Sequence, residues 1–204
     1  MALAAGVDLS LHTYWYLGRA GGLVAFALLL LSIVLGVAIS SRIFDGLLAR
    51  AWFFELHKFI SLFLIAAVLF HALIMLPDPY AHYSLDELLV PFRSHILPEA
   101  TAAGILSFYG IVLIGLSFYL TKWIGQRAWR VLHYVTFATY AGGALHAVWA
   151  GTDSGLLEVR YFYLASALGL VFFIQYRILA ARSQRKAAAR PAKAEFDRGV
   201  SRAA

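Results

Sequence analysis

Five apolar runs of about 20 residues dominate this sequence, and each is bounded by charged residues or by glycine and proline. The runs cover residues 17–40, 54–76, 103–121, 128–150 and 159–180. A run of this length spans a bilayer as a helix, because lipid offers no hydrogen-bond partner to backbone N–H and C=O groups. We therefore predict an all-α, polytopic membrane bundle of about five transmembrane helices.

The composition is typical of a membrane protein. Hydrophobic residues make up 62% of the chain and charged residues only 14%, and the mean hydropathy is +0.76. In soluble proteins about a quarter of the residues are charged. The chain has no cysteine, which excludes disulfides, thiolate haem ligands and iron–sulfur clusters held by its own residues.

The predicted bundle, residues 17–180, lies between two short terminal segments. We expect residues 1–16 to form an extracytoplasmic N-terminal segment. Residues 181–204 carry seven Lys/Arg against two Asp/Glu, which accounts for most of the formal net charge of +6. A basic segment next to a span binds anionic lipid or a partner protein on the cytoplasmic side, so no nucleic-acid binding is expected. Its alanine-rich, proline-interrupted sequence predicts partial disorder.

The loop charges predict the orientation of the spans. Basic residues flank the first and third connections, namely Arg42, Arg50, Lys58, Lys122, Arg127 and Arg130. The second connection, residues 77–102, carries four acidic residues against Arg93, and the fourth is also mainly acidic. Basic loops stay in the cytoplasm, which places the N-terminus outside and the C-terminus inside.

Four histidines lie inside apolar runs, two in the second and two in the fourth. His57 and His71 are fourteen residues apart, and His133 and His146 are thirteen residues apart. At about 1.5 Å per residue, the two histidines of each run lie roughly 20 Å apart along the helix axis. Both runs cross in the same direction, so His57 should meet His133 near the inner face and His71 should meet His146 near the outer face. Paired imidazoles at two depths predict two haems, each held by two histidines.

Ionisable groups are costly inside a membrane, and coordination to iron keeps an imidazole neutral. A proton relay is the main competing interpretation, but it needs intramembrane carboxylates, and Glu55 at a span edge is the sole candidate. Cations at span ends are candidate partners for haem propionates, although ordinary interfacial anchoring is the favoured explanation for each of them. These cations are Arg19, Lys58, Arg127, Arg130 and Arg160.

Thirteen residues of regular helix would leave His133 and His146 about 140° apart around the axis, so the fourth run needs a distortion. Gly142 and Gly143 are the expected place for a kink or a close haem approach, or else they serve helix packing.

Several further residues carry weaker expectations. Phe63 and Tyr140 lie midway between the histidines of their runs and are candidates to fill the space between haems. Residues 85–97 are expected to form a short amphipathic helix over the outer haem. His12, His82 and His95 fall outside the apolar runs and are interpreted as surface residues.

The segments LHKFISLFLIAAVLFH and WRVLHYVTFATYAGGALH, at residues 56–71 and 129–146, resemble bacterial members of the ferric reductase-like transmembrane family. This family includes the haem cores of NADPH oxidases and fungal ferric reductases, and the haem subunit of a bacterial periplasmic methionine sulfoxide reductase system. The resemblance covers roughly residues 17–180. It implies two haem b groups, outward electron flow and a multi-pass protein of a bacterial cytoplasmic membrane.

The chain also departs from the family pattern. The family core has six spans, and we count five, so a partner could supply the sixth. Only about 24 residues follow the last run, without a glycine-rich dinucleotide fingerprint. Flavin or quinone is therefore expected only through a partner. The sequence predicts a di-haem cytochrome that takes electrons from a separate flavoprotein or quinol and passes them to ferric ion, oxygen or a periplasmic redox protein. A haem-carrying assembly subunit and a quinol-oxidising cytochrome b subunit are the alternatives.

Overall fold

A computed structural model describes residues 9–41 and 49–203, with side chains described for 12–41 and 49–183. Arg42, which contributed to the predicted orientation, lies outside these ranges. The described ranges are helical and contain no strand. The helices are α1 (Leu9–Ser41), α2 (Arg50–Leu73), α3 (Leu85–Leu89), α4 (Pro98–Tyr119), α5 (Thr121–His133), α6 (Val135–Ala150), the short 3₁₀ helix η1 (Thr152–Gly155) and α7 (Leu157–Ala203).

Four helices of the described chain are long and apolar enough to cross a membrane. They are His12–Ser41 within α1, Arg50–Leu73, Pro98–Tyr119 and Leu157–Ser183 within α7. The all-helical membrane fold expected from the apolar runs is thus present, and four of the predicted spans correspond to these helices. The predicted span over residues 128–150 is divided between α5 and α6, so the distortion that the histidine spacing requires is present in this run.

The fourth run is interrupted at Tyr134. The amide of Tyr134 donates to Val131 O and the amide of Phe137 donates to Tyr134 O, so the main chain here has hydrogen bonds between residues three apart, as in a 3₁₀ helix. The Thr136 hydroxyl donates to the carbonyl of His133, which satisfies an acceptor at the end of α5. The remaining α6 has 16 residues, a length of about 24 Å, which is shorter than the hydrocarbon core of about 30 Å.

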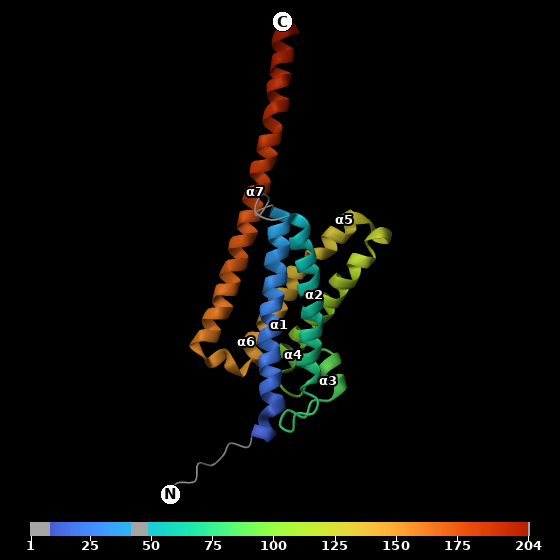
Figure 1. Cartoon of the computed structure of the whole chain (residues 1–204), viewed down its shortest axis with the longest axis vertical. Helices are drawn as coiled ribbons and strands as arrows, with labels where there is room; N and C mark the ends of the chain where they lie inside the picture. The colour runs from blue at the N-terminus through green and yellow to red at the C-terminus, as the bar shows by residue number, and fades with distance from the viewer. Residues whose placement is uncertain (1–8, 42–48, 204) are drawn as a thin grey trace.

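The long helices alternate in direction (Figure 1). α1 and α4 run up the bundle in that view, whereas α2 and α6 run down it. The helix that carries His57 and His71 is therefore parallel to the helix that carries His146, and His133 is the last residue of α5. The lower end, which holds α3 and η1, is named the α3 end. The upper end, which holds α5 and the start of α2, is named the α5 end.

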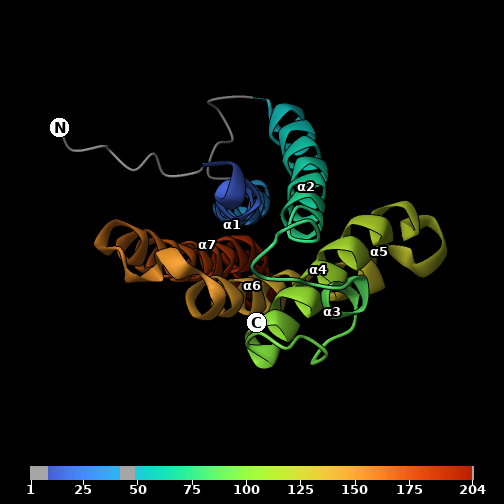
Figure 2. The same cartoon turned by 90° about the horizontal axis from the view of Figure 1, so that it is seen from below.

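Two helix pairs form the bundle: α1 packs on α2, and α6 packs on α4 (Figure 2). Contacts between α1 and α6 and between α2 and α4 join the pairs, whereas α2 and α6 barely approach each other. The buried core lies around α1, with Phe26 and Leu29 packed near Leu64 of α2, Tyr140 of α6 and Leu170 of α7. The helices with histidines thus face each other across a space bounded by α1 and α4.

The last helix, α7, continues through residue 203 and extends well beyond the bundle (Figure 1). Residues 181–203, for which the sequence predicts partial disorder, are thus helical in the structure. The side chains of residues 184–204 lie outside the described part, and lipid binding by this segment stays a prediction.

Candidate functional site

The four intramembrane histidines form two facing pairs. The rings of His57 and His133 have centres 6.3 Å apart at the α5 end, and those of His71 and His146 have centres 6.0 Å apart at the α3 end. The partners are those expected from two parallel helices. The break at Tyr134 lies between His133 and His146, where an unbroken helix would have turned one of the two rings away from α2.

These spacings suit a metal ion between each pair of rings. With metal–nitrogen bonds of about 2.0 Å, the value for zinc, two imidazoles on opposite sides of one ion have ring centres roughly 6 Å apart. Within the described residues, no group of three or more His, Cys, Asp or Glu side chains could hold a metal ion. A metal ion between either pair would therefore have two ligands from these histidines and would need others from a separate group, as a porphyrin supplies.

Main-chain carbonyls fix the tautomer of both histidines at the α3 end. His71 Nδ1 lies 2.7 Å from Gly18 O, and His146 Nδ1 lies 2.9 Å from Ala100 O. A carbonyl oxygen only accepts hydrogen bonds, so each Nδ1 carries the proton and each Nε2 keeps its lone pair. Metal-ligating histidines in proteins commonly have their second nitrogen held in this way.

Glycines on the neighbouring helices make room for these rings. A Cβ at Gly104 of α4 would lie 2.8 Å from Cγ and Nδ1 of His146, and a Cβ at Gly22 of α1 would lie 3.0 Å from Cε1 of His71. At the other end, a Cβ at Gly36 would lie 3.5 Å from Cε1 of His57, which is an ordinary contact. Side chains at positions 22 and 104 would therefore push the rings out of place.

The pair at the α5 end has weaker support. His57 Nδ1 lies 3.5 Å from the hydroxyl of Ser32, which in turn lies 2.8 Å from the hydroxyl of Ser61. Among the described side chains, His133 Nδ1 and Trp129 Nε1 are buried without a hydrogen-bond partner, and their rings lie 4.9 Å apart. Buried polar atoms are normally hydrogen-bonded, so these two nitrogens are open to a hydrogen bond with a bound group.

A cavity of about 510 Å³ opens at the α3 end. Its lining is mostly apolar and includes Gly22, His71, Gly104 and His146, with Arg19 near its edge. Binding sites for small molecules and cofactors are commonly cavities of about 300–1,000 Å³ with a few converging polar groups. The cavity thus falls within the usual size range of cofactor sites and is lined by both imidazoles of the α3-end pair.

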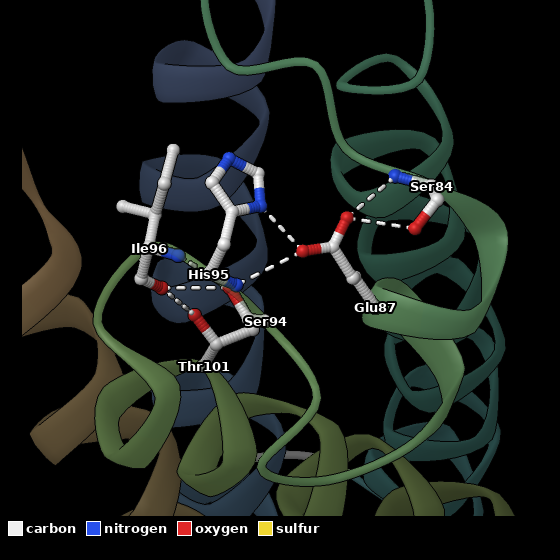
Figure 3. Close-up of polar contacts among 6 residues, drawn as sticks. All are labelled: Ser84, Glu87, Ser94, His95, Ile96 and Thr101. Carbon is white, nitrogen blue, oxygen red and sulfur yellow. Dashed lines mark hydrogen bonds and ion pairs between the residues drawn. The ribbon is translucent and has the colours of Figure 1, made fainter.

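A clasp centred on Glu87 holds the loop over this cavity (Figure 3). Its carboxylate accepts hydrogen bonds from the backbone and hydroxyl of Ser84 and from the backbone and ring of His95. The backbone N–H of Ser84 and the ring of His95 are the main causes that lower the pKa of Glu87 from 4.5 to about 2. The expected helix over residues 85–97 begins at Leu85 but ends at Leu89, because Val90 turns to an extended conformation.

The five cations proposed as propionate partners have different surroundings in the structure. Arg19 of α1 pairs with Asp153 of η1 at the edge of the cavity, with Nε 2.9 Å from Oδ2. Lys58 pairs with Glu55 on its own helix, and Arg160 donates to Ser154 O. Of the five, Arg19 lines the cavity, so it is the one positioned toward a group held there.

Arg127 and Arg130 on α5 are exposed. A different cation, Arg177 of α7, lies near the α5-end pair: it donates to the Tyr134 hydroxyl at 3.2 Å and its guanidinium lies 5.5 Å from that ring's centre. The sequence analysis missed it, since its proximity depends on how α7 packs.

The sequence analysis also missed Gly22 and Gly36, although the sequence carried a signal for them. They are fourteen residues apart, as are His57 and His71 on the adjacent antiparallel helix. Gly104 has no such signal, because its partner His146 comes from a helix that contacts α4 only in the folded bundle.

The other expectations have mixed outcomes. The kink is not at Gly142 and Gly143, since α6 is continuous there; Gly142 instead packs against Ser107 of α4, as the packing alternative predicted. Tyr140 is buried, whereas Phe63 is half exposed and does not fill the interior.

In the loop after α2, His82 and His95 are exposed, and His12, the first residue of the membrane-length part of α1, is partly buried by a ring stacked on Tyr80. No protein-family model, curated protein or solved structure matches the chain. The histidine pairs and the cavity are therefore the features of the chain that bear on its function.

Proposed function

We propose that the protein is a di-haem b membrane cytochrome that carries electrons across the bilayer. The observation that carries this proposal is the recurrence of one arrangement at two depths: facing imidazoles with ring centres 6.3 and 6.0 Å apart. The cavity beside His71 and His146 and the carbonyls that keep their Nε2 atoms unprotonated support it further. Histidines that serve only helix packing would not be expected to form facing imidazole pairs at two depths.

The residues of the chain hold and insulate the cofactors. His57 and His133 are the ligands at the α5 end, and His71 and His146 are the ligands at the α3 end. A bound haem b supplies reversible one-electron chemistry at its iron. The apolar helices exclude water, and Arg19 provides a cation for a carboxylate near the α3 end.

The direction of transport follows from the loop charges. We infer that the α5 end faces the cytoplasm and the α3 end faces outward, with α5 and α6 together making a broken fifth crossing. Electrons then enter near His57 and His133 from a flavoprotein or quinol and leave near His71 and His146 to ferric ion, oxygen or a periplasmic redox protein. This arrangement agrees with the resemblance to the ferric reductase-like family and with a bacterial cytoplasmic membrane.

The decisive experiment is a reduced-minus-oxidised visible spectrum of the purified protein, with pyridine haemochrome quantification. We expect two haem b per chain. Each single alanine variant of His57, His71, His133 or His146 should lose about one haem, because the remaining imidazole of the pair would no longer hold it alone. A matched control is His82→Ala, an exposed histidine outside the spans, which should keep both. A colourless protein, or four histidine variants with unchanged haem content, would refute the proposal.

A further inference from the structure

We propose that Ser32, held by Ser61, is a positioning residue for His57 and lowers the redox potential of the haem at the α5 end; this inference rests on the proposed function. Ser32 is buried in α1, with 6% of its surface exposed. Its hydroxyl lies 3.5 Å from His57 Nδ1 and 2.8 Å from the hydroxyl of Ser61.

The three groups lie in a fixed order across the interface between α1 and α2. Ser61 comes one turn after His57 on α2, so both side chains lie on the same face of that helix, toward Ser32. A buried serine hydroxyl has one proton to donate and two lone pairs to accept with. If His57 Nδ1–H donates to Ser32, the proton of Ser32 is free to point at Ser61.

This order makes Ser32 an acceptor whose oxygen is polarised by its own donated hydrogen bond. At 3.5 Å the contact with the ring is long, and a movement of about half an ångström would bring it to ordinary hydrogen-bond length. The close Ser61 contact keeps the Ser32 hydroxyl in position for that movement.

Ser32 is a distinctive target for substitution. Within the described part of the chain, it is the single side-chain acceptor within hydrogen-bond distance of any of the four rings. The acceptors at the α3 end are main-chain carbonyls that a substitution leaves in place, and His133 has no acceptor. The hydroxyl of Ser32 is therefore a contact to His57 that a substitution can remove, whereas the main-chain bond between Ser32 and His57 stays in place.

The sign of the effect follows from ligand basicity. A hydrogen bond from Nδ1–H makes the imidazole a stronger electron donor, which stabilises ferric iron over ferrous iron and lowers the reduction potential. Removing the hydroxyl should therefore raise the midpoint potential of the α5-end haem and leave that of the α3-end haem unchanged.

The test is a potentiometric titration of the purified haem-loaded protein, followed by visible absorbance. The His71→Ala variant, which keeps only the α5-end haem, identifies the midpoint to be followed. Ser32→Ala should raise that midpoint, Ser61→Ala should raise it by less, and Ser32→Thr, which keeps a hydroxyl, should return it toward wild type. Ser117→Ala is the control, because Ser117 is equally buried but donates to Ile114 O of its own helix.

The outcomes separate the two proposals. Absence of haem from the wild-type protein defeats the proposed function. Normal haem content with wild-type midpoint potentials in both Ser32→Ala and Ser61→Ala overturns the role of Ser32 but leaves the proposed function standing. An equal shift of the midpoint potential in Ser117→Ala has the same consequence. If Ser32→Ala fails to retain the α5-end haem, Ser61→Ala decides the matter, since it leaves Ser32 in place; an unshifted midpoint there contradicts the inference.

Discussion

The two histidine pairs use the same ligand type on the same two parallel segments, yet their surroundings differ. At the α3 end, main-chain carbonyls hold both rings, Gly104 lies against the ring of His146, and the loop held by the Glu87 clasp covers the cavity. At the α5 end, Ser32 contacts one ring through a long hydroxyl contact and its main chain, Nδ1 of the other ring has no hydrogen-bond partner among the described residues, and the helix breaks directly after His133.

The difference shows how a bundle can preorganise one site more than another. A carbonyl in a helix is fixed by the helix itself, so a ring bonded to it has one tautomer and one orientation. A hydroxyl rotates, and a ring beside a broken helix moves with the break. We therefore expect the α3-end site to be sensitive to small steric changes and the α5-end site to adapt to them.

The largest expected effect is from Gly104→Ala. The new Cβ would lie 2.8 Å from the ring of His146, which is held against the same helix, α4, by its bond to Ala100 O, so the ring must shift. We expect a cost of about 1–3 kcal/mol in stability and loss of more than half of the α3-end haem. Haemochrome quantification measures it, with Gly169→Ala as control, since no atom lies within 4 Å of a Cβ there. Equal losses in both variants would contradict the steric explanation.

A smaller effect separates Gly22→Ala from Gly36→Ala. The first would place a Cβ 3.0 Å from the ring of His71, and the second 3.5 Å from the ring of His57. We expect Gly22→Ala to lower the temperature at which the α3-end haem is lost, and Gly36→Ala to change stability by less than about 0.5 kcal/mol. Thermal release of haem, followed at the Soret band, makes the comparison. If Gly36→Ala lowered the temperature of haem release more than Gly22→Ala, the α5-end site would be the more sterically sensitive of the two, contrary to our expectation.

The ion pairs at the two ends provide a third comparison. Asp153 is 13% exposed and pairs with Arg19 at the cavity edge, whereas Glu55 is 66% exposed and pairs with Lys58 on one helix turn. Asp153→Asn should destabilise the protein by about 1 kcal/mol and Glu55→Gln by a few tenths at most, because solvent screens the exposed pair. Thermal unfolding in detergent tests this, and equal shifts would show that burial of the pair is irrelevant.

The smallest effect concerns the Glu87 clasp and its dependence on pH. The folded-state pKa of Glu87 is lowered to about 2 from 4.5, so its contribution is complete above pH 4.5 and is lost as pH falls toward 2. Hydrogen exchange of residues 84–97 should therefore accelerate between pH 4.5 and 2 in the wild type, after correction for the intrinsic pH dependence. Glu87→Gln should exchange faster at neutral pH and lose this pH dependence; a wild-type profile in that variant would argue against the clasp.

Much of the architecture followed from local properties of the sequence. Apolar runs with charged boundaries identified four of the membrane-length helices, since span length and backbone hydrogen bonding in lipid depend only on a contiguous segment. The histidine spacings and the alternating direction of the helices were enough to predict which imidazoles meet. They also predicted that the fourth run must be distorted, although not that the distortion lies at Tyr134.

The sequence by itself therefore determined the helical membrane class, the parallel directions of α2 and α6 and the partners of the four histidines. Only the tertiary structure decided which carbonyls hold the rings, that Gly104 accommodates His146, that Arg19 is paired with Asp153 and that Arg177 approaches Tyr134. Each of these contacts joins residues more than 40 positions apart. They depend on how the helices are rotated and offset against one another, which the packing of side chains sets and no single helical pattern encodes.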